Sequence, residues 1–437
     1  MYSRQWIKGS PQLQKALGNT GWLLVDRMLR MLIGVTVGAW VARYLGPGQF
    51  GELAYIMAFI AFFQVIAGLE ANGFIVRDIA RDKEDAAIIL GTSLRLRLVA
   101  GVTSWLSAIL LISLLHPGDG KLCLLVAIVG ATLLFQASDT VDLWFESQSQ
   151  SKRTVIAKSA SYLFSNGIKI ILLLLKAPLA AFAGLLSLEA AALAIALTVA
   201  YRRYPTTERW RADRAQAKKL LHLCWPFIAS GLMITAYMRI DQIMLKEMLG
   251  ERELGIYAAA LALAQVWNVI PATLVASLAP FVAREKSRGE AEYQNALVKI
   301  FRSFALMAVT GASFTALLSH WLVALLYGAE YRASAVVLCT LVFVNVFIFQ
   351  GIAQSLWIIN NNVRIVNLIA TSLAALISIV ANLFLIRSYG IMGAVFSYLI
   401  AQGTSVVLIP CLLRRDLLGL YKRAFLGMAR AQQSPGR

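Results

Sequence analysis

The chain has 437 residues, of which 59% are hydrophobic and 15% are charged, and its mean hydropathy is +0.68. So few polar residues do not cover a water-facing surface around so many apolar ones, which excludes a soluble enzyme, a secreted disulfide scaffold and a nucleic-acid-binding domain. The 41 Lys and Arg outnumber the 23 Asp and Glu and leave a net charge of +18. Where the positive charges lie is therefore the first question.

Twelve apolar stretches are long enough to cross a bilayer. A hydrocarbon core of about 30 Å requires roughly 20 residues of helix, and continuous apolar runs predict helices rather than the alternating strands of a barrel. The first stretch is too long for a signal peptide and no cleavage pattern follows it, so we expect none. The predicted spans are 20–45, 50–70, 88–115, 121–145, 155–176, 178–200, 221–245, 254–281, 298–319, 333–358, 364–386 and 391–413.

The positive charges lie mostly on one side of the predicted membrane. With the loops assigned alternately and the N-terminus inside, 27 Lys and Arg fall on the inner side, six on the outer side and eight within spans. Basic loops remain cytoplasmic, so this bias predicts both termini in the cytoplasm and an even number of spans. The basic segment 201–220 and the tail 414–437 are predicted to lie on anionic headgroups of the inner leaflet.

A short motif occurs twice with an offset of 204 residues, as LGPGQFG at 45–51 and LGERELG at 249–255. Each copy enters an Ala-rich helix that leaves through a basic cytoplasmic stretch. The shared offset predicts two parallel six-helix lobes, 1–206 and 207–437. Paired lobes around a central site are typical of secondary transporters.

Motifs for metal binding, ATP hydrolysis or catalysis are missing from the sequence. The four cysteines and three histidines lie singly, without the spacing of a metal site or a triad. The run Gly118-Asp119-Gly120-Lys121 does not complete a phosphate loop, because Leu122 follows it. We therefore expect no metal and no cofactor. No loop is long enough for a soluble catalytic domain, so a transporter is predicted rather than an enzyme.

Ionisable side chains within the predicted spans are functional candidates, because they cost several kcal/mol in hydrocarbon unless they pair or face a polar cavity. The candidates for a cationic substrate cavity are Arg30, Lys169, Arg239, Arg95 and Arg97, of which the first three lie too deep for all to be matched locally. The candidate charge partners, or ion-coupling groups, are Asp26, Asp139, Asp142 and Asp241. Pairing of each deep arginine with its neighbouring aspartate and contact with substrate both remain open.

A cationic cavity indicates an anionic cargo. Because the cell interior is negative, each negative charge that is exported gains about 2.3 kcal/mol per 100 mV of membrane potential. A pyrophosphate group with two charges gains about twice that, so its export needs no ATP.

Five motifs, spread over nearly the whole chain, carry a family resemblance. The most specific is YMRIDQIML at 237–245, and the others are ARYLGPGQFG at 42–51, DLWFESQ at 142–148, YGAEY at 327–331 and YGIMGA at 389–394. These segments resemble the oligosaccharide-lipid flippases of the MOP superfamily, the Wzx-type exporters of O-antigen and other polysaccharides. The sequence departs from the family pattern at Glu146, where Gln is more usual, and at Arg387, where Pro is expected.

The resemblance implies an all-α integral membrane protein with twelve transmembrane helices in two six-helix lobes, in a V-shaped MOP/MATE-like arrangement. It implies a lipid-linked oligosaccharide as cargo, carried on undecaprenyl pyrophosphate and moved from the cytoplasmic to the periplasmic leaflet of a bacterial inner membrane. It also implies polysaccharide polymerase machinery as a partner. Our leading hypothesis is a flippase in which Arg30, Lys169 and Arg239 help to bind the pyrophosphate.

Two alternatives remain. A cation-coupled multidrug antiporter of the same superfamily is disfavoured by the mostly basic deep residues, although Asp26, Asp139 and Asp241 keep it open. A membrane enzyme that polymerises or ligates glycans is disfavoured by the short outer loops.

Overall fold

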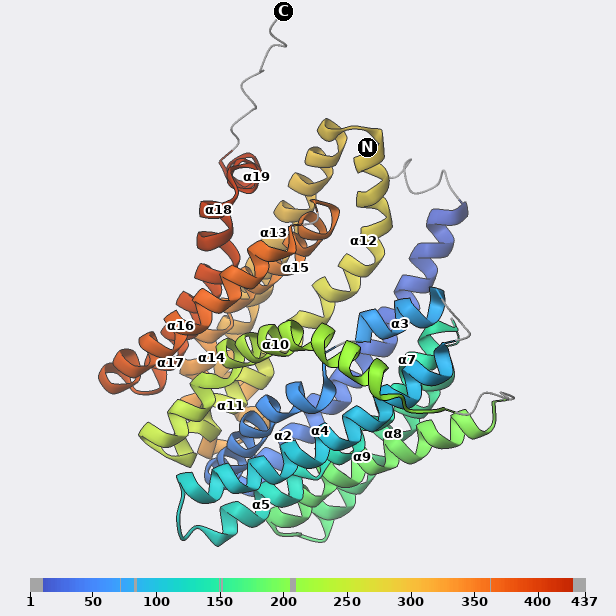
Figure 1. Cartoon of the computed structure of the whole chain (residues 1–437). Coiled ribbons are helices and arrows are strands. Elements are labelled where there is room, and N and C mark those ends of the chain that lie inside the picture. The colour runs from blue at the N-terminus through green and yellow to red at the C-terminus, as the bar shows by residue number, and fades with distance from the viewer. Residues whose placement is uncertain are drawn as a thin grey trace, which may run out of the picture. The chain divides into compact units, whose positions relative to one another are not determined.

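Helices make up all the regular structure of the described chain (Figure 1). The structure, a computed structural model, describes residues 11–70, 72–81, 85–148, 150, 152–204, 210–361 and 363–426, with side chains at all of these positions except 11–29, 80, 81 and 364. A helix satisfies its backbone hydrogen bonds internally, as hydrocarbon demands. The predicted all-helical fold is confirmed.

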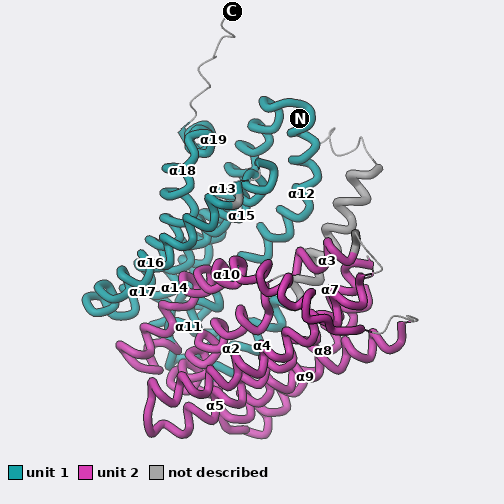
Figure 2. The backbone as a smooth tube through the Cα atoms, viewed as in Figure 1, with its two compact units in different colours: residues 1–43, 256–437 teal, residues 44–255 magenta. Residues whose placement is uncertain are grey.

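The chain forms two compact units (Figure 2). Unit 1 contains Met1–Arg43 and Ile256–Arg437, and unit 2 contains Tyr44–Gly255. Most of the first predicted span thus belongs to unit 1, and the seventh to unit 2. The predicted lobes, 1–206 and 207–437, remain a prediction.

Unit 2 begins within the longest helix and ends within another. Its elements are the second part of α2 (Pro11–Gly68), α3 (Asn72–Arg81), α4 (Ala86–Leu115), α5 (Gly120–Gly130), α6 (Thr132–Phe135), the 3-10 turn η1 (Gln136–Ser138), α7 (Asp139–Ser147), α8 (Lys152–Leu174), α9 (Leu179–Arg202), α10 (Arg214–Leu249) and the start of α11 (Glu251–Gln265).

Unit 1 contains the first part of α2 and the remainder of α11. It continues through η2 (Val266–Asn268), α12 (Val269–Arg288), α13 (Glu290–Leu326), η3 (Ala329–Tyr331), α14 (Arg332–Leu341), α15 (Val344–Asn361), α16 (Arg364–Tyr389), α17 (Ile391–Gly403), the π-turn η4 (Thr404–Leu408), α18 (Ile409–Leu413) and α19 (Arg415–Phe425).

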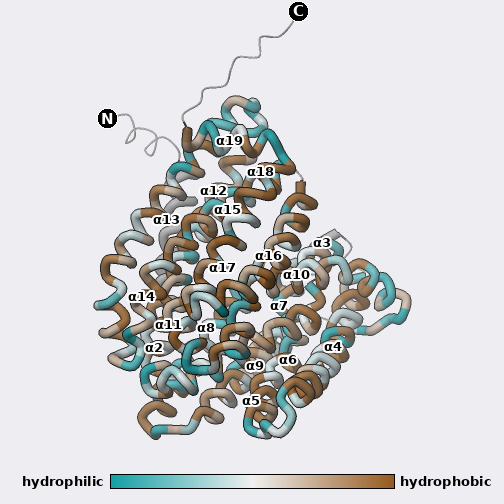
Figure 3. Tube along the Cα trace, turned by 90° about the vertical axis from the view of Figure 1, so that its left-hand side faces the viewer, coloured by the Kyte–Doolittle hydropathy of each residue, from teal (hydrophilic) through white to brown (hydrophobic). Residues whose placement is uncertain are grey.

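Most of these helices are largely hydrophobic (Figure 3). Within the described residues, nine helical stretches are long and apolar enough to cross a membrane, or ten if the bent pair 329–341 and 344–361 forms one span. All twelve predicted spans coincide with helices, but length and composition do not establish the number twelve. Two features explain why fewer than twelve stretches are counted. The helix α2 joins two predicted spans at Gly46, and α8 carries Lys158 and Lys169, which lower its hydropathy.

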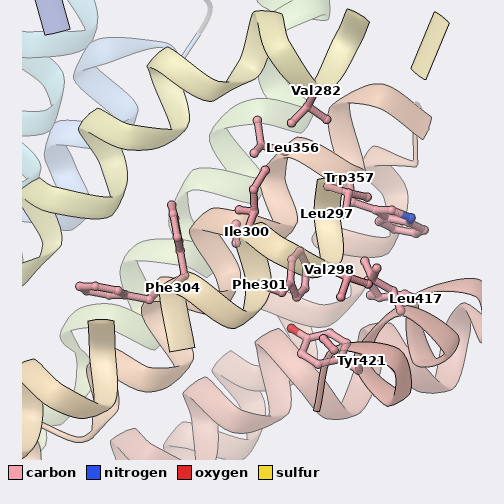
Figure 4. Close-up of a cluster of buried hydrophobic side chains, with 14 of the residues drawn as sticks. Val282, Leu297, Val298, Ile300, Phe301, Phe304, Leu356, Trp357, Leu417 and Tyr421 are labelled. Carbon is pink, nitrogen blue, oxygen red and sulfur yellow. The ribbon is translucent and has the colours of Figure 1, made fainter. Parts of the chain in front are cut away.

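A cluster of aromatic and aliphatic side chains from α12, α13, α15 and α19 forms part of the core of unit 1 (Figure 4). Tyr421 of α19 meets Phe301 of α13 edge-on, with ring centroids 5.3 Å apart. The apolar face of α19 is therefore covered by protein, although the tail 414–437 is predicted to lie on lipid headgroups. Lys422 on its other face is exposed, so headgroup contact by the basic side chains remains a prediction; residues 427–437 lie outside the described part.

The two copies of the duplicated motif share a backbone conformation. Gly46 has φ 71° and ψ 168°, and Gly250, which is 204 residues later, has φ 96° and ψ 174°. Both lie in the left-handed half of the map that favours glycine. This local likeness supports the duplication that the sequence predicts.

Within unit 2 the two copies also touch each other through their backbones. A Cβ atom on Gly51 would lie 1.8 Å from the carbonyl oxygen of Glu251, and one on Gly255 would lie 1.8 Å from that of Pro47. Residues 51 and 255 are equivalent by the 204-residue offset, as are 47 and 251. The contact is thus reciprocal, as at a two-fold interface, and only glycine allows so close an approach.

Candidate functional site

A cluster of polar side chains surrounds Arg97 in unit 2, and of its members Arg97 itself is the buried one. The Arg97 side chain is 1% exposed, and its Nη2 atom donates a hydrogen bond of 2.5 Å to Oδ1 of Asn72. Asp139 and Glu70 are close enough to attract the guanidinium electrostatically. A guanidinium in this position requires such compensation, because an unpaired charge is costly inside a membrane protein. We call these four residues the Arg97 cluster.

Two interrupted helices bring the cluster together. Between α2 and α3, Leu69 and Glu70 have φ values of 58° and 43°, which are uncommon for residues other than glycine. Before α7, the 3-10 turn η1 replaces α-helix immediately ahead of Asp139. Residues in uncommon backbone conformations cluster at functional sites.

A hydrogen bond joins the two breaks. Gln136 of η1 donates from Nε2 to the carbonyl oxygen of Gln64, at 3.1 Å. A Cβ atom on Gly68 would lie only 2.8 Å from the same Nε2 atom. The close approach of these segments is consistent with Glu70 and Asp139 both lying near Arg97.

Lys158 and Lys169 of α8 both have acidic partners on other helices. Nζ of Lys158 lies 2.5 Å from Oδ2 of Asp142 on α7. Nζ of Lys169 lies 3.7 Å from Oε2 of Glu189 on α9, and Ser165 donates a hydrogen bond to the same carboxylate oxygen. Lys169 is therefore matched locally by a residue that the sequence analysis missed. The sequence does mark Glu189 as a candidate partner, since it is an ionisable residue within the predicted span 178–200.

Arg239 and Asp241 of α10 do not pair with each other. Asp241 is 2% exposed, and its Oδ1 atom accepts a hydrogen bond from the backbone N–H of Gln242. Arg239 is half-buried and forms no hydrogen bond or ion pair with any residue of the described chain. Helical residues two apart do not face each other, so the proposed internal neutralisation of Arg239 does not occur here.

The remaining predicted residues lie in other surroundings. Arg95 is exposed and lines a pocket of 240 Å³ with Asp213 and Arg214, on a different face of α4 from the buried Arg97. Arg30 is half-buried, and Asp26 lies outside the residues whose side chains are described. Within unit 2 the structure joins Arg97 with Asp139, and Asp142 and its partner Lys158 lie close enough to Asp139 to interact with it electrostatically. No group of three or more His, Cys, Asp or Glu suited to a metal occurs among the described residues.

Comparison with known proteins assigns the fold. Residues 16–286 match the family model described as polysaccharide biosynthesis protein, whereas no curated protein matches the chain. An inward-facing multidrug resistance MATE family transporter of the MOP superfamily is 17% identical, with a TM-score of 0.72 over 90% of this chain and 96% of that one. The Lipid II flippase MurJ, in an inward closed conformation, is 12% identical, with a TM-score of 0.70 over 92% and 90%.

A third solved structure has the same fold. It is a MOP superfamily transporter from Pyrococcus furiosus, 16% identical, with a TM-score of 0.59 over 91% of this chain and 96% of that one. Identities this low show the fold alone. The chain is a multi-pass membrane protein with the MOP fold that its motifs predict.

Proposed function

Because the chain belongs to the polysaccharide biosynthesis protein family of Wzx-type flippases, we propose that it carries lipid-linked oligosaccharides across the bacterial inner membrane. The proposed cargo is a repeat unit of O-antigen or another surface polysaccharide on undecaprenyl pyrophosphate. It moves from the cytoplasmic to the periplasmic leaflet by alternating access, both termini are cytoplasmic, and no covalent bond is made or broken. The family match over residues 16–286 carries this proposal, and the likeness to a lipid II flippase supports it.

The basic side chains within the spans supply the attraction for pyrophosphate. Arg239 is the first candidate, because it is half-buried and has no acidic partner in the described chain. A guanidinium forms paired, charge-assisted hydrogen bonds with phosphate oxygens. Lys169 and Arg30 are the other two residues proposed to bind pyrophosphate, and the Glu189 carboxylate, 3.7 Å from Nζ of Lys169, weakens the attraction of Lys169 for an anion. Arg95 and Arg97 are also proposed to bind the substrate, and Arg97 would do so later in the cycle, since it is buried here.

The Arg97 cluster is proposed to respond to an ion. Neutralising Asp139, by H⁺ or Na⁺, would remove the attraction that offsets the buried guanidinium of Arg97 and would favour an arrangement in which that charge is solvated. Asp142 and Asp241 are less suited to this role, because Asp142 is paired with Lys158 and Asp241 accepts a hydrogen bond from the backbone N–H of Gln242.

A cation-coupled multidrug antiporter is the second candidate function. The TM-score of 0.72 with a MATE family transporter favours it, as does the burial of Asp241. It requires cationic cargo and coupling through a carboxylate.

A deletion strain separates these functions. For a flippase, we expect lipid-linked repeat units to accumulate on the inner leaflet of the cytoplasmic membrane, where added glycosidases do not reach them in intact spheroplasts. Accumulation on the outer leaflet would instead indicate a polymerase or ligase. Normal surface glycan with increased drug sensitivity would indicate the antiporter.

Purified protein in liposomes then tests the cationic site. Flipping of a fluorescent lipid-linked oligosaccharide is expected to fall about tenfold or more with Arg239→Gln, since a charge-assisted hydrogen bond to phosphate contributes about 1.5–3 kcal/mol. The control is Arg288→Gln, which removes a charge whose side chain is 64% exposed. If neutralising Arg30, Lys169 and Arg239 together leaves flipping intact, the cationic site is wrong.

A further inference from the structure

A groove opens in unit 2 between α3, the start of α4 and the first half of α10. The three helices are labelled in Figure 1. Its volume is 1090 Å³, which is enough for several sugar rings and slightly above the usual range for small-molecule sites. The lining residues belong to unit 2 alone. None of them is among the span residues proposed above to bind pyrophosphate. We call this the α3–α10 groove.

Aromatic rings form one wall of the groove. Phe74 and Phe227 meet edge-on, with ring centroids 4.9 Å apart. Trp225 lies beside them, and 60% of its surface is exposed. An exposed indole supplies both an apolar face and a polar N–H. The C–H face of a pyranose packs flat on such a ring, while the hydroxyl groups around the sugar edge remain free for hydrogen bonds.

Donors and acceptors lie next to this wall. Arg77 donates from Nε and Nη2 to Oδ1 of Asp78, at 3.0 and 2.8 Å, and its guanidinium lies 4.9 Å from the centre of the Phe74 ring. Asp85 and Gln216 add a second carboxylate and an amide. Each hydroxyl of a sugar is both donor and acceptor, so a mixed set of this kind satisfies it.

The helix backbone provides one more acceptor. Pro226 lies inside α10 and has no N–H, so the carbonyl group of His222, four residues earlier, lacks its usual helical donor. Both residues line the groove. A sugar hydroxyl can fill the place of the missing donor.

The balance of charge distinguishes this groove from a phosphate site. The charges of Asp78 and Asp85 offset those of Arg77 and Lys219, so the lining offers little net attraction for an anion. An ordinary interfacial aromatic belt explains Trp225 alone, but not two carboxylates and an amide around it. Neutral, hydroxyl-rich ligands fit this lining best.

We propose that the α3–α10 groove binds the oligosaccharide part of the cargo. This rests on the proposed flippase function and adds to it that two parts of the cargo are bound in different places. The basic side chains within the spans bind the pyrophosphate, and the groove binds the sugars. Arg77 and Lys219 lie in segments predicted to be cytoplasmic, so the groove meets the glycan on the side where it is assembled. Sugar selectivity is then a property of the groove lining rather than of the cationic site.

A matched pair of tryptophans tests the proposal. Trp225 and Trp321 are both 60% exposed, and Trp321, in α13 of unit 1, does not line the groove. In the full-length protein in its host, a benzophenone amino acid at 225 is expected to crosslink to radiolabelled lipid-linked glycan, whereas the same probe at 321 labels phospholipid. Trp225→Ala is expected to reduce glycan export about three- to tenfold, as for loss of an aromatic contact. Trp225→Phe keeps the ring and should retain most export, and Trp321→Ala should not alter it.

The outcomes separate the two proposals. If surface glycan does not depend on the chain at all, the flippase function itself fails. If glycan export depends on the chain but the probe at 225 labels only phospholipid, or if Trp225→Ala and Trp321→Ala export equally, the groove is not a sugar site. Should Trp225→Ala fail to accumulate in the membrane, the crosslink at 225 and the Trp225→Phe variant decide the question.

Discussion

Replacing Gly51 by alanine is expected to force apart the two copies of the duplicated motif in unit 2. The added Cβ would lie 1.8 Å from the carbonyl oxygen of Glu251, whereas real Cβ contacts essentially never fall below 3.0 Å. The difference requires the two segments to separate by about 1.2 Å along this contact. Both sides of the contact are main chain, so no side chain can rotate away. Overpacking of this kind costs about 1–3 kcal/mol and occasionally more.

Thermal unfolding of the purified full-length protein in detergent measures this cost. For a unit of 150–250 residues, 1 kcal/mol corresponds to about 2–4 °C in melting temperature, so a decrease of about 2–12 °C is expected. Gly48→Ala is the matched control, because it adds the same methyl group to the same motif with nothing within 4 Å. If Gly51→Ala and Gly48→Ala melt at the same temperature, the backbone contact does not exist as described.

Two further predictions concern charged side chains. Arg302→Ala is expected to lower the melting temperature, because the guanidinium donates hydrogen bonds of 2.6 and 2.8 Å to carbonyl groups at the end of α19. The control is Lys299→Ala, an exposed position one turn away, which should leave the melting temperature unchanged. Equal effects of the two substitutions would contradict a stabilising role for the hydrogen bonds of Arg302. Arg97→Met is expected to cost about 1–3 kcal/mol in unfolding free energy, since it leaves the half-buried carboxylate of Asp139 and the amide oxygen of Asn72 without the guanidinium. Lys158→Met breaks a half-exposed pair worth about 0.2–1 kcal/mol. The opposite order in denaturant unfolding would show that Arg97 is not the centre of a compensated cluster.

The helices were predictable because their signal is local. Continuous apolar runs of about 20 residues predict helix, and each predicted run coincides with helix, although helix bounds and run bounds differ. The interruptions within helices were not predictable from the same runs. Leu69 and Glu70 have positive φ, although their side chains give no local reason for it. That conformation depends on α3 and α7 packing nearby, which is tertiary information.

The pairing of charges was only partly predictable for a related reason. Sequence spacing shows which residues share a helix face three or four positions apart, but Lys169 and Glu189 lie on different helices. Lys121 and Glu52 form a similar pair, with a 2.7 Å contact across 69 residues of sequence. Recognising either pair requires knowing which helices adjoin.

The duplicated motif shows how a weak sequence signal can have a strong structural basis. The two copies share three of seven residues: the leading leucine and two glycines. Gly46 and Gly250 are the shared positions that adopt positive φ, and Gly51 and Gly255 are the shared positions with no room for a Cβ. The backbone thus requires glycine at these shared positions, while the residues between them are free to differ.

The reciprocity of this contact can be tested with a double substitution. Gly51→Ala and Gly255→Ala each insert a methyl group between the same two backbone segments, against Glu251 and Pro47 respectively. One separation of about 1.2 Å relieves both clashes, so the second substitution should add little once the first has been made. The double variant is therefore expected to melt close to the less stable single variant, with a coupling energy of at least about 1 kcal/mol. Independent sites add to within about 0.3–0.5 kcal/mol. Additive losses would mean that each glycine fills a separate role and that the two copies do not form one reciprocal contact.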